Sequence, residues 1–575
     1  MPSGENVALL GAAFQIGRSA LAAYQAAIAI TGQNIANVGN PDYARQSARL
    51  AALPGGMTVA GVAPGSGVDV TSLERHIDEA VEARLRLALG QRSGAQTVYE
   101  TLNRVESLYN ELTDGDLSSQ LSEFFGSLSN LQTDPAETTA RDLVIANADA
   151  VIHTLQRQRT GLLSEVNDLN DSAEQVTQTA NSLAAQIADL NEKVVTAEAR
   201  GQGGAGALRD RRDALLRQLG ELLDIQTREQ ASGIVNVYVG SEPLVDFNRS
   251  RGLKTQTVLE GGLERVTVRF ADNGSTVVMR SGKLAAIVQA RDGYLADQLA
   301  QLDQLTAGLI YEVNCVHSSG RGLVGYTRVA GTYAVDDPDA ALNSTAANLP
   351  FPVQNGTFFA QVRDRATGQV TSRMIEVDLD GLNGDDTTLN SLAVALSAVP
   401  GLKASVTGDN RLQIDANAGF EVSFSEDSSH ALAALGVATF FDGTNAATLA
   451  VSAAVRDDPR LLATSLDGSP GDGTNAGRLA AVGAAASALL GNVSVEEFHG
   501  RLVNGLAVEA AAANTEQTAA DAVYSSLLAQ REATSGVSLD EEAINLTRYE
   551  QSFQGASRFI TVLNTLADEV LSLVE

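Results

Sequence analysis

The chain begins and ends with apolar positions spaced as in a helix that packs against another helix. At both ends, apolar or small residues recur in alternating steps of four and three. Steps averaging about 3.5 residues keep one narrow stripe facing a partner helix. The stripe positions are Leu10, Phe14, Gly17, Leu21, Tyr24, Ile28, Thr31 and Ile35 at the first end, and Leu546, Tyr549, Phe553, Ala556, Ile560, Leu563, Ala567, Val570 and Val574 at the second.

A stripe of this kind in one helix usually packs into the chain's own core. Two such stripes at opposite ends indicate more, because pairing them with each other covers only one face of each helix. The other faces of the first helix are rich in Ala and Gly, and Arg18 is the only charged residue between Ala8 and Pro41. We therefore expect both ends to pair with each other and with further close helix neighbours. The residues expected at this assembly interface are Leu10, Phe14, Leu21, Tyr24, Ile28, Ile35, Leu546, Tyr549, Phe553, Ile560 and Leu563.

Two interior segments keep the same rhythm and predict long helices with one buried face. Three motifs predict helix starts, because each places an oxygen-bearing side chain three residues ahead of a glutamate. They are Asp134 to Glu137, Ser494 to Glu497 and Ser538 to Glu541. The interior stripes are Leu162, Val166, Leu169, Ala173, Val176, Ala180, Leu183, Ile187, Leu190 and Val194, then Leu295, Leu299, Leu302, Thr306, Leu309, Val313 and Val316.

Two stretches change to a period of two, which is typical of strands. The first predicts a small antiparallel sheet with strands at 233–239, 265–270 and 276–279. The second, from about 345 to 453, predicts a self-contained, mostly β domain with one helix near 389–399. Its strand-like segments are 358–362, 374–378, 402–406, 412–415 and 420–424.

These patterns predict a mixed α and β, multidomain fold. Both chain ends form a long helical bundle or coiled-coil core, and β-rich domains are nested within it as insertions. The expected segments are 1–85, an N-terminal axial helix and turn that pairs with 494–575; 86–225, a helical bundle; 226–283, a small antiparallel β insertion; 284–340, the returning long helix; 341–460, a β-rich outer domain; and 461–575, the returning helices and the C-terminal axial helix.

Composition excludes several partners and disfavours some chemistry. The 575 residues include 40 Lys and Arg against 70 Asp and Glu, a formal charge of -30, which repels nucleic acid and anionic membranes. The single cysteine, Cys315, forms no internal disulfide and is most simply a small buried apolar group. The apolar stretch 8–32 lacks a preceding Lys or Arg and is interrupted by polar residues, so we expect neither a signal peptide nor a membrane span.

Several motifs imitate catalytic or ligand-binding signatures. Gly201 to Gly206 matches a dinucleotide fingerprint, but a helical pattern precedes it where that motif needs a strand. Asp378, Asp380 and Asp386 resemble parts of a calcium loop without its full spacing, and a surface turn held by Asp386 is favoured. We expect no catalytic residue, metal or cofactor, because the histidines are scattered without metal-ligand spacing. They are His76, His153, His317, His430 and His499.

The turn after the first helix resembles a family signature. Residues 34–46 read Asn-Ile-Ala-Asn-Val-Gly-Asn-Pro-Asp-Tyr-Ala-Arg-Gln. They are similar to the Asn-Ile-Ala-Asn-x-x-Thr-Pro-Gly-Tyr signature of bacterial flagellar axial proteins of the rod, hook and hook-associated classes. Segments 208–213, 282–316, 433–442 and 535–546 are also similar, and Arg45-Gln46 and Phe440-Phe441 favour the hook-associated class. The signature residues are Asn34, Asn37, Pro41, Tyr43 and Arg45.

Two departures stand within this signature. Asn40 replaces the usual Thr and Asp42 the usual Gly, so we expect a slightly different turn, because Asp adopts the left-handed conformation less readily than Gly. Asn and X-Pro favour helix ends, so Asn34, Asn37 and Pro41 are expected to shape the helix exit rather than to bind a ligand.

The resemblance implies a structural role at the junction between flagellar hook and filament, outside the cell. Subunits of this family assemble as a ring in a helical array, with terminal helices forming the inner tube and β domains facing outward. The implied partners are further copies of the chain, the hook protein, a second junction protein of the hook-associated protein 3 type, and an export chaperone for the C-terminal tail. The resemblance also implies export through the flagellum's type III channel without a cleaved signal peptide.

Two further expectations concern the ends. In the free chain they are expected to be largely disordered, because helices without a packed partner are marginal, and a charge at Leu21 or Phe553 is expected to abolish assembly. Other readings stay open: a hook, rod or second hook-associated component, a hydrolase or lectin activity in the β-rich segment, or a cytoplasmic coiled-coil scaffold.

Overall fold

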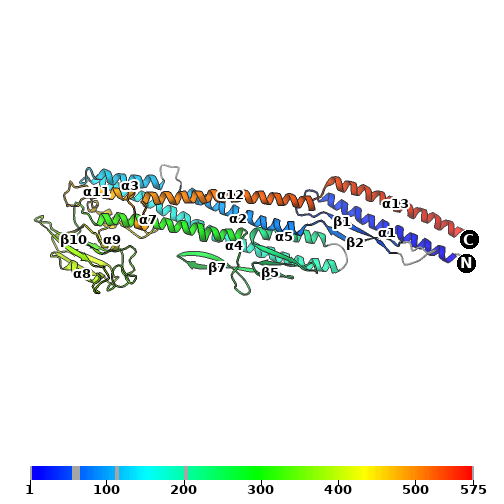
Figure 1. The fold of residues 1–575 in the computed structure, drawn as a ribbon, viewed down its shortest axis with the longest axis horizontal. Coiled ribbons are helices and arrows are strands. Elements are labelled where there is room, and N and C mark those ends of the chain that lie inside the picture. The colour runs from blue at the N-terminus through cyan, green and yellow to red at the C-terminus, as the bar shows by residue number, and fades with distance from the viewer. Residues whose placement is uncertain (1–2, 55–64, 110–115, 200–204, 573–575) are drawn as a thin grey trace. The chain divides into compact units, whose positions relative to one another are not determined.

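The computed structural model describes residues 3–54, 65–109, 116–199 and 205–572 (Figure 1). The chain forms two compact units, and helices α2 (Glu79–Tyr109), α4 (Thr138–Ala199) and α12 (Val495–Ser535) contribute one part to each. Unit 1 comprises Met1–Tyr99, Leu169–Gln289 and Ala513–Glu575, and unit 2 comprises Glu100–Asp168 and Ala290–Ala512. The predicted mixed helical and β fold, with long helices at both ends, is confirmed. The segment boundaries expected from the sequence remain a prediction.

Unit 1 joins the two chain ends. Helix α1 (Ser3–Ala36) and helix α13 (Leu539–Ser572) pack along each other in antiparallel directions, blue and red in Figure 1. Strands β1 (Gln46–Leu53) and β2 (Gly67–Arg75) form an antiparallel pair that packs on a second side of α1. The sequence did not predict this pair, because Ala, Leu and Arg in β1 favour helices and only strand pairing against α1 overrides that preference.

Unit 1 also carries two sheets beside α4. After α5 (Gly206–Leu222), strands β3 (Ile225–Glu229), β4 (Val235–Val239), β5 (Glu242–Asp246) and β6 (Arg249–Ser250) form an antiparallel meander. Strands β7 (Leu253–Glu260) and β8 (Leu263–Phe270) form a second, two-stranded sheet, and α6 (Lys283–Gln289) follows. The strands predicted at 233–239 and 265–270 correspond to β4 and β8. The strand predicted at 276–279 is wrong, since only Thr276 makes an isolated bridge, to Arg269, and no strand continues from it.

Three asparagines attach these sheets to α4. Asn170, Asn181 and Asn191 each donate their side-chain N–H to a strand carbonyl and accept a backbone N–H from the same strand. Their partners are on β8, at Leu253 of β7 and at Val235 of β4. Spacings of eleven and ten residues, about three helical turns, place the three amides along one face of α4. The asparagines therefore fix the position of the strands along the helix.

Unit 2 combines helices with an aromatic core. Its helices include α3 (Leu117–Leu131), the first part of α4, and α7 (Ala296–Ser318), which a π-helical turn (Ala290–Leu295) precedes. Phe124 lies 5.9 Å from Phe440 and 5.8 Å from Phe441, measured between ring centroids. Asn314 accepts the backbone N–H of both Phe440 and Phe441. The Phe pair that helped to indicate the family is thus a core element.

The predicted β-rich segment folds largely as expected. Strands β10 (Gly356–Asp364), β11 (Val370–Val377) and β14 (Phe420–Ser425) form one sheet, and β9 (Arg328–Ala330), β12 (Leu402–Val406) and β13 (Leu412–Ala416) form another. The helix predicted near 389–399 is α8 (Leu389–Ser397). Shorter elements complete the unit: α9 (Ala431–Leu435), β15 (Phe441–Asp442), β16 (Ala450–Val451), α10 (Ala453–Asp457), α11 (Thr474–Ala481), and 3-10 turns at Pro459–Leu461, Val482–Ala484 and Ala488–Leu490.

Two of the three predicted helix caps are confirmed. Ser494 Oγ accepts the Glu497 N–H at 3.1 Å, and Ser538 Oγ accepts the Glu541 N–H at 3.5 Å. The cap at Asp134 is wrong, because α4 begins four residues later, at Thr138. There Glu137 accepts the Thr139 N–H through its own carboxylate. The segment from Asp134 instead forms a turn, in which the Glu137 N–H donates to Asp134 O at 3.3 Å.

Candidate assembly site at the chain ends

The contact between α1 and α13 depends on a glycine. A Cβ atom built at Gly17 would lie 2.6 Å from Ile560 and 3.4 Å from Phe559, closer to Ile560 than packed atoms approach. Gly17 therefore lets the two helices come together where a large side chain of α13 meets α1. Among the described residues, α1 buries mainly small or polar side chains along its packed side, namely Gly17, Ala23, Ala27, Thr31 and Asn34.

The predicted interface residues lie at this contact with unequal burial. Only Leu563, 5% exposed, is buried. The other predicted residues are half-buried: Leu10, Phe14, Leu21, Tyr24, Ile28, Ile35, Leu546, Tyr549, Phe553 and Ile560. One helix partner covers part of each stripe and leaves the rest accessible. Val574, the last predicted stripe position, lies outside the described residues.

A second apolar stripe follows the outer side of α13. Phe559, Val562, Leu566 and Val570 are 42%, 56%, 44% and 37% exposed. Their steps of three and four residues place them on one helix face, and Val570, predicted for the first stripe, belongs to this one. The four-three spacing predicts one seam per helix and does not include this stripe. Phe559 borders the contact with α1 at Gly17, and all four side chains keep more than a third of their surface exposed.

Asn34 connects the turn to both chain ends. Its side-chain N–H groups donate to Gln46 O at 2.8 Å and to Glu542 Oε2 at 3.0 Å. Its Oδ1 accepts from Tyr43 OH at 2.7 Å and from Gln46 N at 3.1 Å. With 1% of its surface exposed, Asn34 uses its full hydrogen-bonding capacity in the interior. A buried amide so engaged fixes the path of the chain where α1 ends.

Arg45 fastens the same turn to the start of α13. Its Nε donates to Glu542 Oε1 at 2.8 Å, and its terminal nitrogen lies 2.8 Å from Glu541 Oε2. Its backbone N–H donates to Ser535 O at 2.9 Å, just before α13. Glu542 is 2% exposed, so both carboxylate oxygens are satisfied by groups from the amino-terminal turn. Burial, with a smaller contribution from Asp210 and Glu542, raises the pKa of Tyr43 to about 12, so its hydroxyl remains a donor.

The other signature residues act locally. Asn37 donates to Gln33 O at 2.9 Å and caps the last turn of α1, while Pro41 is exposed. The left-handed conformation is taken by Gly39 (φ 78°), and Asp42 keeps a negative φ. The positive φ in this turn is therefore supplied by Gly39 and not by the residue at position 42.

Asp42 instead begins a chain of ion pairs. Its carboxylate lies 2.6 Å from Arg217 of α5, which lies 3.2 Å from Glu82 of α2. Glu82 also accepts from Arg531 of α12 at 2.6 Å, and both are almost fully buried. These contacts join the turn to three helices of unit 1. No sequence signal identifies Arg217, Glu82 or Arg531, since ion pairs across such separations have no local pattern.

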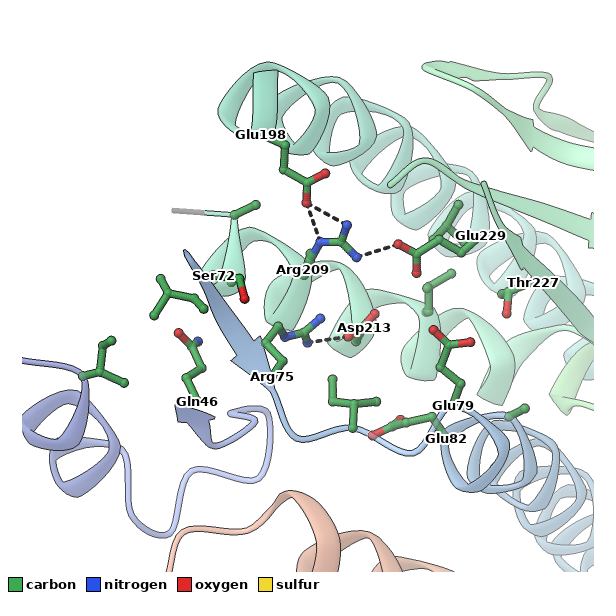
Figure 2. A pocket seen from close by; sticks show the side chains of 18 of the residues that line it. Gln46, Ser72, Arg75, Glu79, Glu82, Glu198, Arg209, Asp213, Thr227 and Glu229 are labelled. Carbon is green, nitrogen blue, oxygen red and sulfur yellow. Dashed lines mark hydrogen bonds and ion pairs between the residues drawn. The ribbon is translucent and has the colours of Figure 1, made fainter. Parts of the chain in front are cut away.

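A cavity of about 1300 Å³ with charged and apolar lining residues lies beside this network (Figure 2). Figure 2 shows Arg209 directed toward Glu198 and Glu229, at 2.8 and 2.5 Å, and Arg75 toward Asp213, at 2.7 Å. The acidic lining residues outnumber the arginines, and each arginine already has an oxygen partner, which disfavours an anion site. The lining includes no histidine or cysteine to act with Ser72. The cavity therefore offers no recognisable nucleophile and base.

The residues of the candidate ligand motif outside this site make hydrogen bonds that hold the fold. Asp386 Oδ1 accepts the Gly381 N–H, which confirms the predicted turn, and Asp378 and Asp380 likewise accept loop N–H groups. These three aspartates lie close together, but their oxygens serve that turn. Of the dinucleotide-like motif, Gly201–Gly204 lies outside the described residues, and α4 rather than a strand ends before it.

Three of the histidines make hydrogen bonds within the fold, and the cysteine is buried. His317 is fully buried, donates from Nδ1 to Ala438 O and accepts the Ala463 N–H at Nε2, and burial lowers its pKa to about 4. His430 pairs with Tyr311, and His76 with Ser47. Cys315 is buried, as predicted. In the described part of the chain, the helices include none long and apolar enough to cross a membrane.

Comparison with known proteins supports the flagellar resemblance. Residues 102–330 match the family described as Flagellar hook-associated protein FlgK helical domain. Flagellar hook-associated protein 1 of Salmonella typhimurium is 25% identical, covering 96% of this chain and 98% of the relative. The Bacillus subtilis protein of that name is 24% identical, covering 96% of each. The flagellar hook junction protein FlgK from Burkholderia pseudomallei shares the fold, with a TM-score of 0.50 and 16% identity, over 79% of this chain and all of that one.

The domain match, the full-length relatives and the signature turn agree with one another. Along 96% of its length the chain is similar to flagellar hook-associated protein 1, and residues 102–330 match the FlgK helical domain.

Proposed function

We propose that this chain builds the hook–filament junction of the bacterial flagellum by assembling through its paired terminal helices. The observation that carries the mechanism is the pair of incompletely covered stripes on α1 and α13. Each half-buried Leu, Ile or Phe retains apolar surface, and burying it contributes about 25 cal/mol per Å². A neighbouring copy buries this remaining apolar surface. The role is structural, without a catalytic residue, metal or cofactor.

The outer stripe of α13 extends this argument. Phe559, Val562, Leu566 and Val570 form an apolar surface about three turns long, on a helix whose other face α1 already occupies. The exposed side of α1 offers small residues, including Gly11, Ala22, Ala29 and Gly32, where large side chains fit closely. Large residues on one helix and small residues on the other suit repeated packing between copies.

The remaining parts of the proposal follow from the family. The partners are the hook protein, a second junction protein of the hook-associated protein 3 type and an export chaperone for the C-terminal tail, and neither nucleic acid nor membrane. The chain reaches the flagellum through the type III channel. The β-rich segment 341–460 and the other segments expected from the sequence act as outer and connecting parts.

Charge substitutions at half-buried stripe positions test the mechanism. Leu21→Glu or Phe553→Glu should abolish assembly, because a carboxylate buried between copies has no partner, while the melting temperature of the monomer changes by only a few degrees. Assembly is measured by sedimentation, electron microscopy and binding to isolated hook ends. Gln554→Glu, the exposed neighbour of Phe553, is the matched control and should assemble normally. Normal assembly of the Leu21 and Phe553 variants would reject the proposal.

A further inference from the structure

An aromatic side chain stands in an unfavourable backbone conformation on the surface of unit 1. Phe247 begins the two-residue loop between β5 and β6 and has a φ of 54°. Glycine and asparagine are the usual residues at such loop positions, because a Cβ atom disfavours positive φ. The ring nevertheless remains 49% exposed. Phe247 thus combines a conformational cost with incomplete burial.

Two buried asparagines hold Phe247 in this conformation. Its backbone carbonyl accepts from Asn191 Nδ2 at 2.7 Å, and its N–H donates to Asn236 Oδ1 at 3.0 Å. Asn191 is 0% exposed and Asn236 is 5% exposed, so both anchors belong to the rigid interior. Among the described residues, the ring stacks on no other aromatic and lies under no arginine. The scaffold therefore presents the ring outward without using it internally.

An apolar groove of about 550 Å³ lies between α2 and α12 in the same unit. Leu87 and Val523, each 50% exposed, stand on its two sides, and Ala88 forms part of its floor. Half-exposed Leu and Val on facing helices retain apolar surface that a large side chain is able to cover. The groove is lined by Arg84, Leu87, Ala88, Gln91, Ala522, Val523, Ser526 and Leu527. In Figure 1, β5 and α12 lie on opposite sides of α4 in this unit.

Charges around the loop and the groove are complementary. Arg84 at the groove is exposed and makes no ion pair with any residue the structure describes. Asp246 precedes Phe247, and Glu192 accepts from Asn248 beside it; neither carboxylate has an ion-pair partner in the described ranges. Arg249 follows the loop, and the Arg92–Asp521 pair lies one turn beyond the groove. An arginine at the groove thus matches a carboxylate beside the ring.

We propose that Phe247 of one copy inserts into the groove between α2 and α12 of a neighbouring copy, with Asp246 beside Arg84. This inference rests on the proposed self-assembly and adds a contact outside the terminal helices. Because ring and groove are different surfaces, the contact is heterologous and extends through successive copies. A buried aromatic anchor in a pocket is also the usual form of an energetic centre in protein interfaces.

Replacement of Phe247 separates this role from a role in folding. Phe247→Asn should leave the monomer's melting temperature unchanged or raise it, because Asn tolerates positive φ. It should raise the protein concentration needed for half-maximal assembly by about tenfold or more. Phe247→Tyr keeps the ring and should assemble like the unmodified chain. Leu259→Asn, at a 73% exposed leucine near the end of β7, is the matched control and should also assemble normally.

Disulfide cross-linking identifies the contact surface. Phe247→Cys and Val523→Cys variants are prepared separately, and the native Cys315 adds little background because it is buried. Oxidation of their mixture under assembly conditions should give a mixed dimer, while neither variant alone should. Dimers from one variant alone would show a groove-to-groove or loop-to-loop contact and overturn the proposal.

Two outcomes separate this inference from the proposed function. Unchanged assembly of Phe247→Asn, or no mixed dimer while the unmodified chain assembles, rejects the loop–groove contact and leaves terminal-helix assembly standing. Failure of the unmodified chain to assemble under any condition rejects the proposed function itself.

Discussion

Helix α4 and the terminal pair α1 and α13 carry the same spacing of apolar residues with opposite outcomes. All ten predicted stripe residues of α4 are buried, none more than 7% exposed. Of the predicted interface residues in α1 and α13, only Leu563 is buried. Strands bind α4 through its asparagines, and α2 binds it through Arg104 and Glu165, whereas among the described residues α1 and α13 pack mainly on each other. A four-three stripe therefore indicates that a partner is required, but not that the same chain provides it.

Limited proteolysis should give the largest difference between the two regions. In the free chain, sites within about the first and last several dozen residues should be cleaved at least about a hundredfold faster than sites in α4, because weakly packed ends open locally without global unfolding. Mass spectrometry of the fragments maps the sites. Equal protection of α1, α13 and α4 would contradict the prediction that the ends fold only on assembly.

A charge in the α4 stripe should be far more damaging than one in the terminal stripe. Ile187→Asp buries a carboxylate at a position that is 0% exposed. It should lower the free energy of unfolding by about 4 kcal/mol or more. Phe553→Asp should lower it by less than about 1 kcal/mol, since that position is half-buried. Denaturant titration followed by circular dichroism measures both, and similar losses would remove the distinction.

Acid should weaken unit 2 through His317, which has no counterpart in the terminal pair. Its folded pKa of about 4 lies below the ordinary value of 6.5 because the ring is buried. The unfolded chain therefore binds the proton first, and stability falls as pH drops from about 6.5 to 4, by on the order of 2–3 kcal/mol. Chemical unfolding of unit 2 measured across this range tests the effect. His317→Gln should be less stable at neutral pH, and its pH dependence should be flatter; an equal slope would exclude His317 as the cause.

Removal of the Asn34 side chain should loosen the ends while leaving α4 intact. Asn34→Ala deprives Tyr43, Glu542 and the Gln46 backbone of a buried partner, at a cost of about 2–3 kcal/mol. Hydrogen exchange should become faster in α1 and α13 and stay unchanged in α4. Asn37→Ala, which removes one exposed local bond, is the matched control with an effect of a few tenths of a kcal/mol. Faster exchange in α4 as well would show that the turn supports the whole unit.

Local pattern was sufficient for the long helices and for most strands of the β-rich segment. Burial along α4 follows directly from the periodicity, and Ser494 and Ser538 form the caps that their spacing predicts. The pattern failed where tertiary contacts override propensity. The β1–β2 pair forms from residues that favour helices, and the Asp134 motif starts no helix because the chain makes a turn before Thr138.

The residues of the candidate site were likewise only partly predictable from the sequence. The sequence identified Asn34, Tyr43 and Arg45 as the signature turn and the apolar stripes as contact surfaces. It did not identify Glu542 as their common partner, nor the ion pairs from Asp42 through Arg217 to Glu82, because those partners lie far apart along the chain.

The sequence by itself determined where helices form, which face of each is apolar, and which family the turn resembles, since these depend on residues only a few positions apart. Tertiary structure alone decided which apolar faces are covered, how Asn34 joins the two ends, and why Phe247 is presented on the surface. Burial and buried hydrogen bonds depend on which distant segments meet, and one-dimensional spacing does not encode those meetings.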